Sequence, residues 1–222
     1  MAAALALALL AAATSRTVDG WGVVTDPDGD CDVKLVGGEL RLGVPATPHN
    51  LNPRLGRLNG VRVLRPVAGD FTLTVKVAGK FEPGGKLSGG RGTVPFVGAG
   101  LLLWADRERF VRVERTAWVL PDGRRLGYPP LVELFAGDEW QVFSRPPVPP
   151  GDFLGGGDVW LRLDRAGDAF TVRVGTDGRG WQTAAEFAAE LPARVQVRVA
   201  AVNTSDAPFA VRFGGLKLAA DD

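Results

Sequence analysis

Three aspartates at alternate positions, followed by the chain's single cysteine, form the segment DPDGDC at residues 26–31. Carboxylates with this spacing begin an EF-hand calcium loop, which also requires glycine at position six and glutamate at position twelve. Counted from Asp26, position six is Cys31 and position twelve is not glutamate. Pro27 and Gly29 favour a turn, in which aspartate side chains accept hydrogen bonds from nearby backbone N–H groups. We predict a turn, with calcium binding as the alternative, and neither a metal nor another cofactor.

Other motifs with known chemistry are incomplete in this chain. His49 is the only histidine, which excludes a metal site made of several histidines. It lies in the loop VPATPHNLNPRLG, where we expect it to bond to the backbone. Gly84–Leu87 lacks the hydroxyl residue of a phosphate-binding loop, and Gly98–Gly100 lacks the third glycine of a dinucleotide fingerprint. No catalytic residue is predicted.

Most of the chain alternates apolar with polar residues, which is the pattern of antiparallel strands that bury one face. Clear examples are residues 40–44, 71–77, 159–164, 170–174, 195–199 and 209–213. Turn sequences separate the strands, as at residues 166–168 and 176–178. The sequence therefore predicts an all-β fold in which two antiparallel sheets pack face to face.

Three segments depart from the strand pattern. A short helix is expected from Thr183, because Thr183 and Glu186 have the spacing of a capping box and Pro192 would close the helix. Long loops rich in glycine and proline occupy residues 83–95 and 144–157. The strand pattern continues across both loops, so we assign residues 20–219 to a single β-sandwich domain.

The predicted strand at residues 109–118 has two different faces. Val111, Val113 and Ala117 share the apolar face, whereas the other face combines two aromatic rings with an arginine and a glutamate. This combination suits a sugar, because a ring can stack on its apolar face while charged groups bond its hydroxyls. A tryptophan and an arginine repeat the theme at residues 159–164. The candidate ligand-binding residues are Phe110, Arg112, Glu114, Trp118, Trp160 and Arg162.

An alternative interpretation makes the same aromatic residues structural. The loops 83–95 and 144–157 would then fold over this face and make a second small core, because large exposed apolar patches are uncommon. The two interpretations differ in whether the tryptophans are exposed.

The balance of charged residues bears on possible partners, and the amino-terminal sequence bears on the location of the protein. The chain has 26 basic and 25 acidic residues, interspersed, so no nucleic-acid partner is expected. The first thirteen residues, MAAALALALLAAA, are too short to span a bilayer and fit the apolar region of a secretory signal, although that region lacks a basic start. We predict that residues 1–19 are a signal peptide or a disordered terminus, and that the protein is secreted or periplasmic without stable membrane insertion.

Three segments carry a resemblance to a known family: GAGLLLWADRERFVRVER at 98–115, DVWLRLDRAGDAFTVRVGTDGRGW at 158–181 and AVNTSDAPFAVRFGGLKL at 201–218. They resemble the concanavalin A-like lectin/glucanase superfamily. The similarity is greatest to the uncharacterised domain shared by regulation-of-enolase proteins and C-terminal modules of some bacterial β-xylosidases. The resemblance implies a jelly-roll sandwich. The Glu-x-Asp-x-Glu motif of the superfamily's glucanases is absent, since Glu133, Asp138 and Glu139 are spaced differently.

Together these observations lead to one functional prediction and two alternatives. We predict a non-catalytic module that binds a polysaccharide or a glycoprotein. The first alternative is a protein–protein or structural module that uses the Pro- and Gly-rich loops. The second alternative is a glycoside hydrolase whose acids are not recognised.

Overall fold

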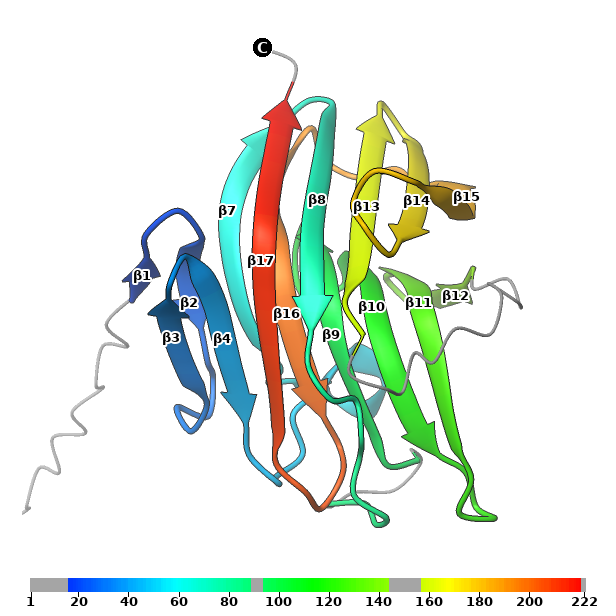
Figure 1. Cartoon of the computed structure of the whole chain (residues 1–222). Helices are drawn as coiled ribbons and strands as arrows, with labels where there is room; N and C mark the ends of the chain where they lie inside the picture. Colours follow the sequence, from blue (N-terminus) through cyan, green and yellow to red (C-terminus); the bar gives the residue numbers. More distant parts are fainter. Residues whose placement is uncertain (1–15, 89–93, 144–156, 221–222) are drawn as a thin grey trace, which may run out of the picture.

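The computed structural model describes residues 16–88, 94–143 and 157–220, which form two antiparallel sheets packed face to face (Figure 1). The strand order is β1-β2-β7-β16-β9-β10-β11-β12 in the first sheet, called sheet A, and β15-β14-β13-β8-β17-β4-β3 in the second, called sheet B. A third pair, β5 and β6, flanks a 3-10 turn, η1. The predicted all-β, two-sheet jelly-roll sandwich is confirmed.

The strands have the following bounds. Sheet A contains β1 (Thr17–Val18), β2 (Gly22–Thr25), β7 (Val61–Ala68), β9 (Phe96–Trp104), β10 (Arg109–Val119), β11 (Arg125–Ala136), β12 (Glu139–Val142) and β16 (Arg194–Asn203). Sheet B contains β3 (Asp32–Val36), β4 (Glu39–Val44), β8 (Phe71–Ala78), β13 (Val159–Ala166), β14 (Ala169–Gly175), β15 (Gln182–Ala188) and β17 (Phe209–Ala220). The small third pair is β5 (Leu51–Asn52) and β6 (Arg57–Leu58), with η1 at Pro53–Leu55.

The main core lies between the two sheets and uses the apolar side of each alternating strand. Val111, Val113 and Ala117 of β10 are buried there, as the strand parity predicts. Leu161 and Leu163 of β13 contribute from sheet B in the same way. Burial of one whole face fixes the register of each strand, because a slip of one residue would expose all these side chains.

The helix expected near Thr183 does not form, and that prediction is wrong. Residues Gln182–Ala188 are strand β15, which pairs with β14 at the edge of sheet B. Pairing is supported by Phe187, whose ring stacks on Phe170 with 5.3 Å between centroids. A register shift in the β14–β15 ladder lets Ala184 and Ala185 both be buried, which hides the strand alternation in the sequence.

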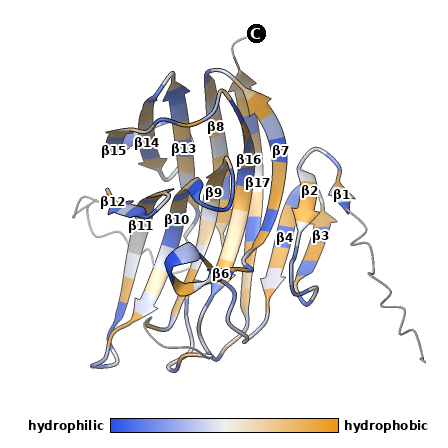
Figure 2. Ribbon diagram, turned by 180° about the vertical axis from the view of Figure 1, so that it is seen from behind, coloured by the Kyte–Doolittle hydropathy of each residue, from blue (hydrophilic) through white to orange (hydrophobic). Residues whose placement is uncertain are grey.

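The outer face of sheet A is partly covered, which the alternation pattern did not predict. Every residue of β9 is buried, because the segment 49–58, which contains β5, η1 and β6, lies over it (Figure 2). Leu51 of this covering segment packs with Leu102, Phe110 and Phe135 in a second apolar cluster. Phe110 therefore belongs to a second small core, as in the structural alternative, but the described cover is segment 49–58 and not the two loops that the alternative named.

The segment that covers this core differs from the expected loops. Part of the loop 83–95 instead runs beside residues 204–206, where Leu87 makes an isolated bridge with Ser205. Residues 89–93 of that loop, and all but Gly157 of the loop 144–157, lie outside the described residues. In the described part of the chain, no helix has the length and apolar character needed to cross a membrane.

Strand β1 precedes the domain start expected at residue 20 and yields a prediction about stability. Val18 is 4% exposed in the main core, and Arg16 Nη2 donates to the Val33 carbonyl at 2.7 Å. A chain that begins at Gly20 loses both interactions, and we expect it to lose about 1.5–3 kcal/mol relative to a chain that begins at Arg16. Thermal unfolding of the two chains measures the difference, and equal Tm values would show that β1 does not contribute to the fold.

Candidate binding pocket on sheet A

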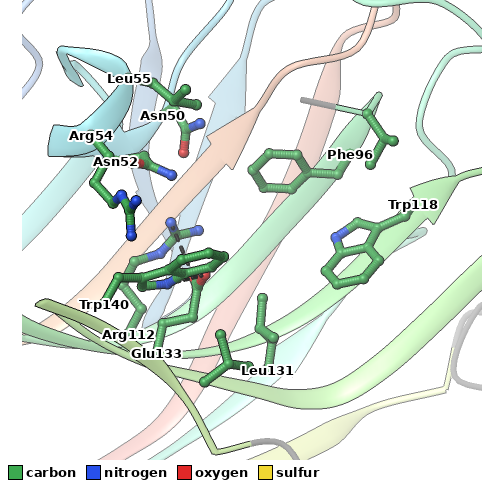
Figure 3. A pocket seen from close by; sticks show the side chains of 12 residues that line it. Asn50, Asn52, Arg54, Leu55, Phe96, Arg112, Trp118, Leu131, Glu133 and Trp140 are labelled. Carbon is green, nitrogen blue, oxygen red and sulfur yellow. Dashed lines mark hydrogen bonds and ion pairs between the residues drawn. The ribbon is translucent and has the colours of Figure 1, made fainter. Parts of the chain in front are cut away.

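A pocket of about 490 Å³ opens on the outer face of sheet A, beside the covering segment 49–58. Figure 3 shows Arg54 and Trp140 on one side of this pocket, Phe96 and Trp118 on the other, and Arg112 and Glu133 beneath Trp140. Its lining residues are Asn50, Asn52, Arg54, Leu55, Val94, Phe96, Arg112, Trp118, Leu131, Glu133, Trp140 and Val142. They come from β9, β10, β11, β12 and the covering segment, except Val94, which belongs to the end of the loop 83–95.

One boundary of the pocket is the end of an aromatic ladder across four strands. Strand register places Trp104, Phe110, Phe135 and Trp140 side by side on β9, β10, β11 and β12. Their ring centroids are 4.8, 4.6 and 6.4 Å apart, and the planes of neighbouring rings differ by only 20° to 24°. The inner rings are fully covered, whereas Trp140 is 42% exposed and lines the pocket. Arg54 adds a cation–π contact 5.6 Å from the Trp140 ring.

A buried charge cluster forms the next row of the sheet. Arg112 is 2% exposed and makes a bidentate pair with Glu114, through Nη2 at 2.5 Å and Nε at 3.1 Å. Its Nη1 lies 3.3 Å from Glu133 Oε2 and donates to the Leu51 carbonyl at 3.0 Å. The cluster therefore ties β10, β11 and the covering segment together through one guanidinium.

Burial and pairing act against each other in this cluster. Burial would lower the pKa of Arg112, but the carboxylates of Glu114 and Glu133 outweigh it and hold that pKa above its ordinary value. Burial also raises the pKa of Glu114 despite its bond to Arg112, and the charge of Glu133 adds to the shift. Two carboxylates share one guanidinium, so the cluster depends on Arg112 more than on either glutamate.

Only one of the two carboxylates faces the pocket. Glu114 is 1% exposed, and its Oε2 would lie 2.7 Å from a Cβ at position 98, so glycine there leaves room for it. Glu133 lines the pocket, and its Oε1 accepts from Trp140 Nε1 at 3.1 Å. In the Gly98–Gly100 pair, which has the spacing of part of a nucleotide motif, Gly98 thus makes room for side chains, and Gly100 allows the close approach of the β10 backbone at Val113 and Glu114.

The structure brings together four of the six candidate residues named from the sequence. Phe110, Arg112, Glu114 and Trp118 share the outer face of β10, and Arg112 and Trp118 line the pocket. Phe110 is fully buried in the ladder and Glu114 is fully buried beneath Arg112, so both support the pocket wall.

Trp160 and Arg162 lie on the other side of the sandwich, on β13 of sheet B, and belong to a different surface. The Trp160 ring lies against the backbone at Gly178 and Gly215, where any Cβ would collide with it. Arg162 pairs with Asp164 at 2.8 Å. A tryptophan and an arginine occur at alternate positions on both β10 and β13. Strand alternation predicts that such residues share one face of a strand, but it does not predict to which sheet the strand belongs.

Several pocket residues were missed by sequence reasoning. Glu133 had a detectable signal, since it is the single charge in the apolar run LVELFA at 131–136. Strand pairing sets it opposite Arg112. Asn50, Asn52 and Arg54 carry no comparable signal, because they reach the pocket only through the tertiary position of the covering segment.

The segment DPDGDC folds as the predicted turn. Asp26 accepts the backbone N–H of Gly29 at 3.2 Å and that of Cys31 at 2.9 Å. Cys31 is half-buried against the main core, and burial, with Asp26 and Asp30 adding to it, raises the pKa of its thiol above the ordinary value. These hydrogen bonds from backbone N–H groups to Asp26 are those expected of an aspartate turn.

This turn also holds the covering segment in place. His49 is fully buried; its Nδ1 lies 3.0 Å from the Thr47 carbonyl, as expected for a loop histidine bonded to the backbone. Its Nε2 lies 2.8 Å from Asp30 Oδ1. Asn59 donates to Asp28 at 2.6 Å and accepts the N–H of Asn50 at 3.0 Å. The aspartates thus fix both ends of the segment that lines the pocket.

The same turn gathers groups that could bind a metal. Asp26, Asp30, Cys31 and His49 each place one ligand atom within 4.8 Å of the others. Calcium prefers ligand sets made entirely of oxygen, which this mixed set is not. The hydrogen bonds within the group already serve the turn and the covering segment.

Comparison with known proteins establishes the fold. No protein-family model matches the chain, and no curated protein sequence matches it. The fold is similar to that of a functionally unknown protein from Saccharomyces cerevisiae, with a TM-score of 0.64 at 16% identity over 91% of this chain and 97% of that chain.

Two bacterial structures have similar folds over part of their length. They are xylan β-1,4-xylosidase from Bacillus halodurans C-125, with a TM-score of 0.56 at 13% identity, and the GH43 BlXynB protein from Bacillus licheniformis, with 0.57 at 14%. Each match covers 86% of this chain but only 34% and 35% of the respective bacterial chains. The resemblance to β-xylosidase modules is thus supported at the level of the fold, which by itself does not imply function.

The charge cluster predicts that a buried and an exposed ion pair on the same strand, β10, differ in their contribution to stability. Arg112→Met leaves two carboxylates buried without a cation, and we expect a loss of about 3–5 kcal/mol at pH 7. Arg109→Met, which removes an exposed pair with Asp106, should cost about 0–1 kcal/mol. Chemical denaturation of both variants measures the contrast.

The Arg112→Met loss should also depend on pH. Burial raises the pKa of Glu114 in the folded state above its unfolded value of about 4.3. Below the unfolded pKa, Glu114 is protonated in both states and its burial costs no charge-related stability. As pH rises through the folded pKa, the charged carboxylate lowers the free energy of unfolding. The variant should therefore be closer to the native protein in stability near pH 4 than at pH 7. A loss that is equal at both pH values would contradict burial of unpaired carboxylates.

The turn gives a further prediction. The Tm of the native protein should be the same in calcium and in a chelator, because no calcium loop is complete. Asp30→Ala should lower stability by about 1–3 kcal/mol, because the buried His49 loses its partner. A calcium-dependent rise in Tm that Asp30→Ala abolishes would establish the calcium alternative.

Proposed function

We propose that the protein is a non-catalytic glycan-binding β-sandwich module, and that its ligand occupies the pocket between Trp118 and Trp140. The observation that carries this proposal is the pairing of two partly exposed tryptophans with a carboxylate and amides in one pocket. A pyranose ring has an apolar face that packs on an indole and a rim of hydroxyls that need donors and acceptors.

The polar groups of the pocket are arranged for recognition of hydroxyls. Glu133 supplies an acceptor that Arg112 and Trp140 already orient. Asn52 lines the pocket, and its Oδ1 has no hydrogen-bond partner among the described residues. The volume of about 490 Å³ falls in the range of small-ligand pockets, about 300–1,000 Å³.

The carboxylates favour binding over hydrolysis. A glycosidase needs two carboxyl groups that flank the scissile bond, one of them free to donate a proton. Glu114 is enclosed with both oxygens bonded to Arg112, so Glu133 is left as the carboxylate that faces the pocket. This arrangement supports the proposal that the module does not cleave its ligand.

Two further observations bear on partners and location. The similarity in fold to a xylan β-1,4-xylosidase makes xylan the first polysaccharide to examine. Export, as expected from residues 1–19, would bring the module to extracellular polysaccharides or glycoproteins. The alternative is a protein–protein or structural module that uses the Pro- and Gly-rich loops, which lie partly outside the described residues.

The proposal predicts that the two tryptophans differ from Trp160. Trp140→Ala and Trp118→Ala should each weaken binding by about 1–3 kcal/mol, because they remove stacking surface. Either should cost less than the ~3–5 kcal/mol of a core aromatic. Trp160→Ala, on sheet B, should leave affinity unchanged. Titration calorimetry with soluble xylan and a panel of other polysaccharides measures the affinities.

Each outcome has a defined consequence. If no glycan in the panel binds the native protein, the proposal fails. If Trp160→Ala weakens binding as much as Trp140→Ala does, the ligand is on sheet B and the pocket assignment is wrong. Release of reducing sugar by the native protein, lost in Glu133→Gln, would replace binding by hydrolysis.

A further inference from the structure

The aspartate turn and the start of the covering segment bring four metal-ligating side chains together. Asp26, Asp30 and Cys31 belong to the turn at residues 26–31, and His49 is the first residue of the covering segment. Each offers one ligand atom, and all four atoms lie within 4.8 Å of one another. Imidazole nitrogen, thiolate sulfur and carboxylate oxygen are the ligand atoms that Zn²⁺ takes in proteins, and four of them complete its tetrahedral structural sites.

His49 faces an acceptor with each of its two ring nitrogens. Nδ1 lies 3.0 Å from the carbonyl oxygen of Thr47, and Nε2 lies 2.8 Å from a carboxylate oxygen of Asp30. A carbonyl and an ionised carboxylate only accept hydrogen bonds, whereas a neutral imidazole carries a single N–H. When Nδ1–H donates to Thr47, the lone pair of Nε2 points at the negatively charged oxygen of Asp30. A cation shared by these two atoms would turn that repulsion into attraction.

Two kinds of cation would satisfy this arrangement, a second proton on the imidazole or a metal ion. A second proton places a full charge on His49, which is fully buried, and such a charge is costly to remove from water. A metal ion also gives a role to Cys31, whose Sγ lies 3.9 Å from the same oxygen of Asp30 that faces His49. A backbone carbonyl on the far ring nitrogen, as at Nδ1, is a usual orienting contact of metal-bound histidines.

The turn carries negative charge that no basic side chain balances. Among the described residues, none of its three aspartates forms an ion pair with a lysine or an arginine; Asp28 and Asp30 lie 3.7 and 2.8 Å from His49 Nε2. Burial raises the pKa of the Cys31 thiol, and the charges of Asp26 and Asp30 add to that shift. A divalent cation would compensate the carboxylates and favour the thiolate, which is the form of cysteine that binds metal.

The spacing of the ligand atoms is close to that of a zinc site. Metal–ligand bonds of about 2.0–2.3 Å place the ligand atoms of a tetrahedral zinc ion about 3.3–3.8 Å apart. The 2.8 Å contact between His49 and Asp30 would open by roughly 0.5–1 Å, and separations of up to 4.8 Å would close by about 1 Å. Asp30 is exposed whereas His49 is buried, so an ion can enter from the side of Asp30.

We propose that these four groups bind one Zn²⁺ ion, which joins the aspartate turn to the covering segment. Four protein ligands make the site structural, because a catalytic zinc keeps one position open. The expectation of no metal rested on a calcium loop and on sites with several histidines, and neither comparison includes mixed ligands from two segments. The zinc site does not depend on what the pocket binds.

The first experiment measures the Tm of native protein that has been dialysed against a chelator and kept in a phosphine reductant. Zinc at about 100 times its Kd should raise Tm by roughly 5–10 °C, because the ligand set exists only in the folded protein. Calcium at the same concentration should leave Tm unchanged. Cobalt(II) in place of zinc should give a thiolate-to-metal charge-transfer band and the visible absorption of a tetrahedral ion.

Matched variants of the turn separate the ligands from nearby charge. Cys31→Ser should abolish the charge-transfer band and weaken zinc binding at least about tenfold. Asp30→Asn should weaken zinc binding to a similar extent. Asp28→Asn removes an equal charge from an exposed aspartate of the same turn that is outside the four ligand groups, so it should bind zinc as the native protein does.

The variants and the native protein together decide the proposal. A rise in Tm with zinc that needs Cys31 and Asp30, but not Asp28, supports the site. No rise in Tm with zinc, or an equal zinc response in Cys31→Ser and Asp28→Asn, would overturn it. A protonated His49 would then account for the short contact with Asp30.

Discussion

The guanidinium of Arg112 holds together the face of sheet A on which the pocket lies. It is buried where two sheet strands and the covering segment 49–58 meet, and it bonds Glu114, Glu133 and the Leu51 carbonyl. An exposed arginine pair would contribute little, but here each partner is enclosed, so removing the shared cation leaves several groups unsatisfied at once. This one side chain therefore fixes β10, β11 and the covering segment, all of which line the pocket, relative to one another.

The same face shows how a two-layer sandwich gains a third, partial layer. The covering segment buries the outer side of β9, and the aspartate turn at residues 26–31 bonds both ends of that segment through His49 and Asn59. A turn whose aspartates have the spacing of a metal-binding loop thereby holds the covering segment against sheet A. The residues of the covering segment that line the pocket are therefore positioned by bonds at the two ends of that segment.

The aromatic ladder crosses the outer face of sheet A from Trp104 to Trp140, where it reaches the pocket. Its inner rings, Phe110 and Phe135, are buried, and each terminal tryptophan has an arginine over its ring, Arg54 at Trp140 and Arg62 at Trp104. At the pocket end, Glu133 lies 3.3 Å from Arg112 and accepts a hydrogen bond from Trp140, so a carboxylate stands beside the exposed ring.

The sequence by itself determined the two-sheet fold and the faces of each strand, because burial of one side of a strand imposes a period of two on the residues. It also placed Arg112 and Trp118 on the same face of their strand, the face on which the pocket lies. Tertiary structure decided what local patterns cannot encode. Pairing with β14 turned a capping-box sequence into strand β15, and the sheet assignment separated Trp160 from Trp118. Asn52, Glu133 and Trp140 came together only through folding, since the pocket they line joins segments far apart in the chain.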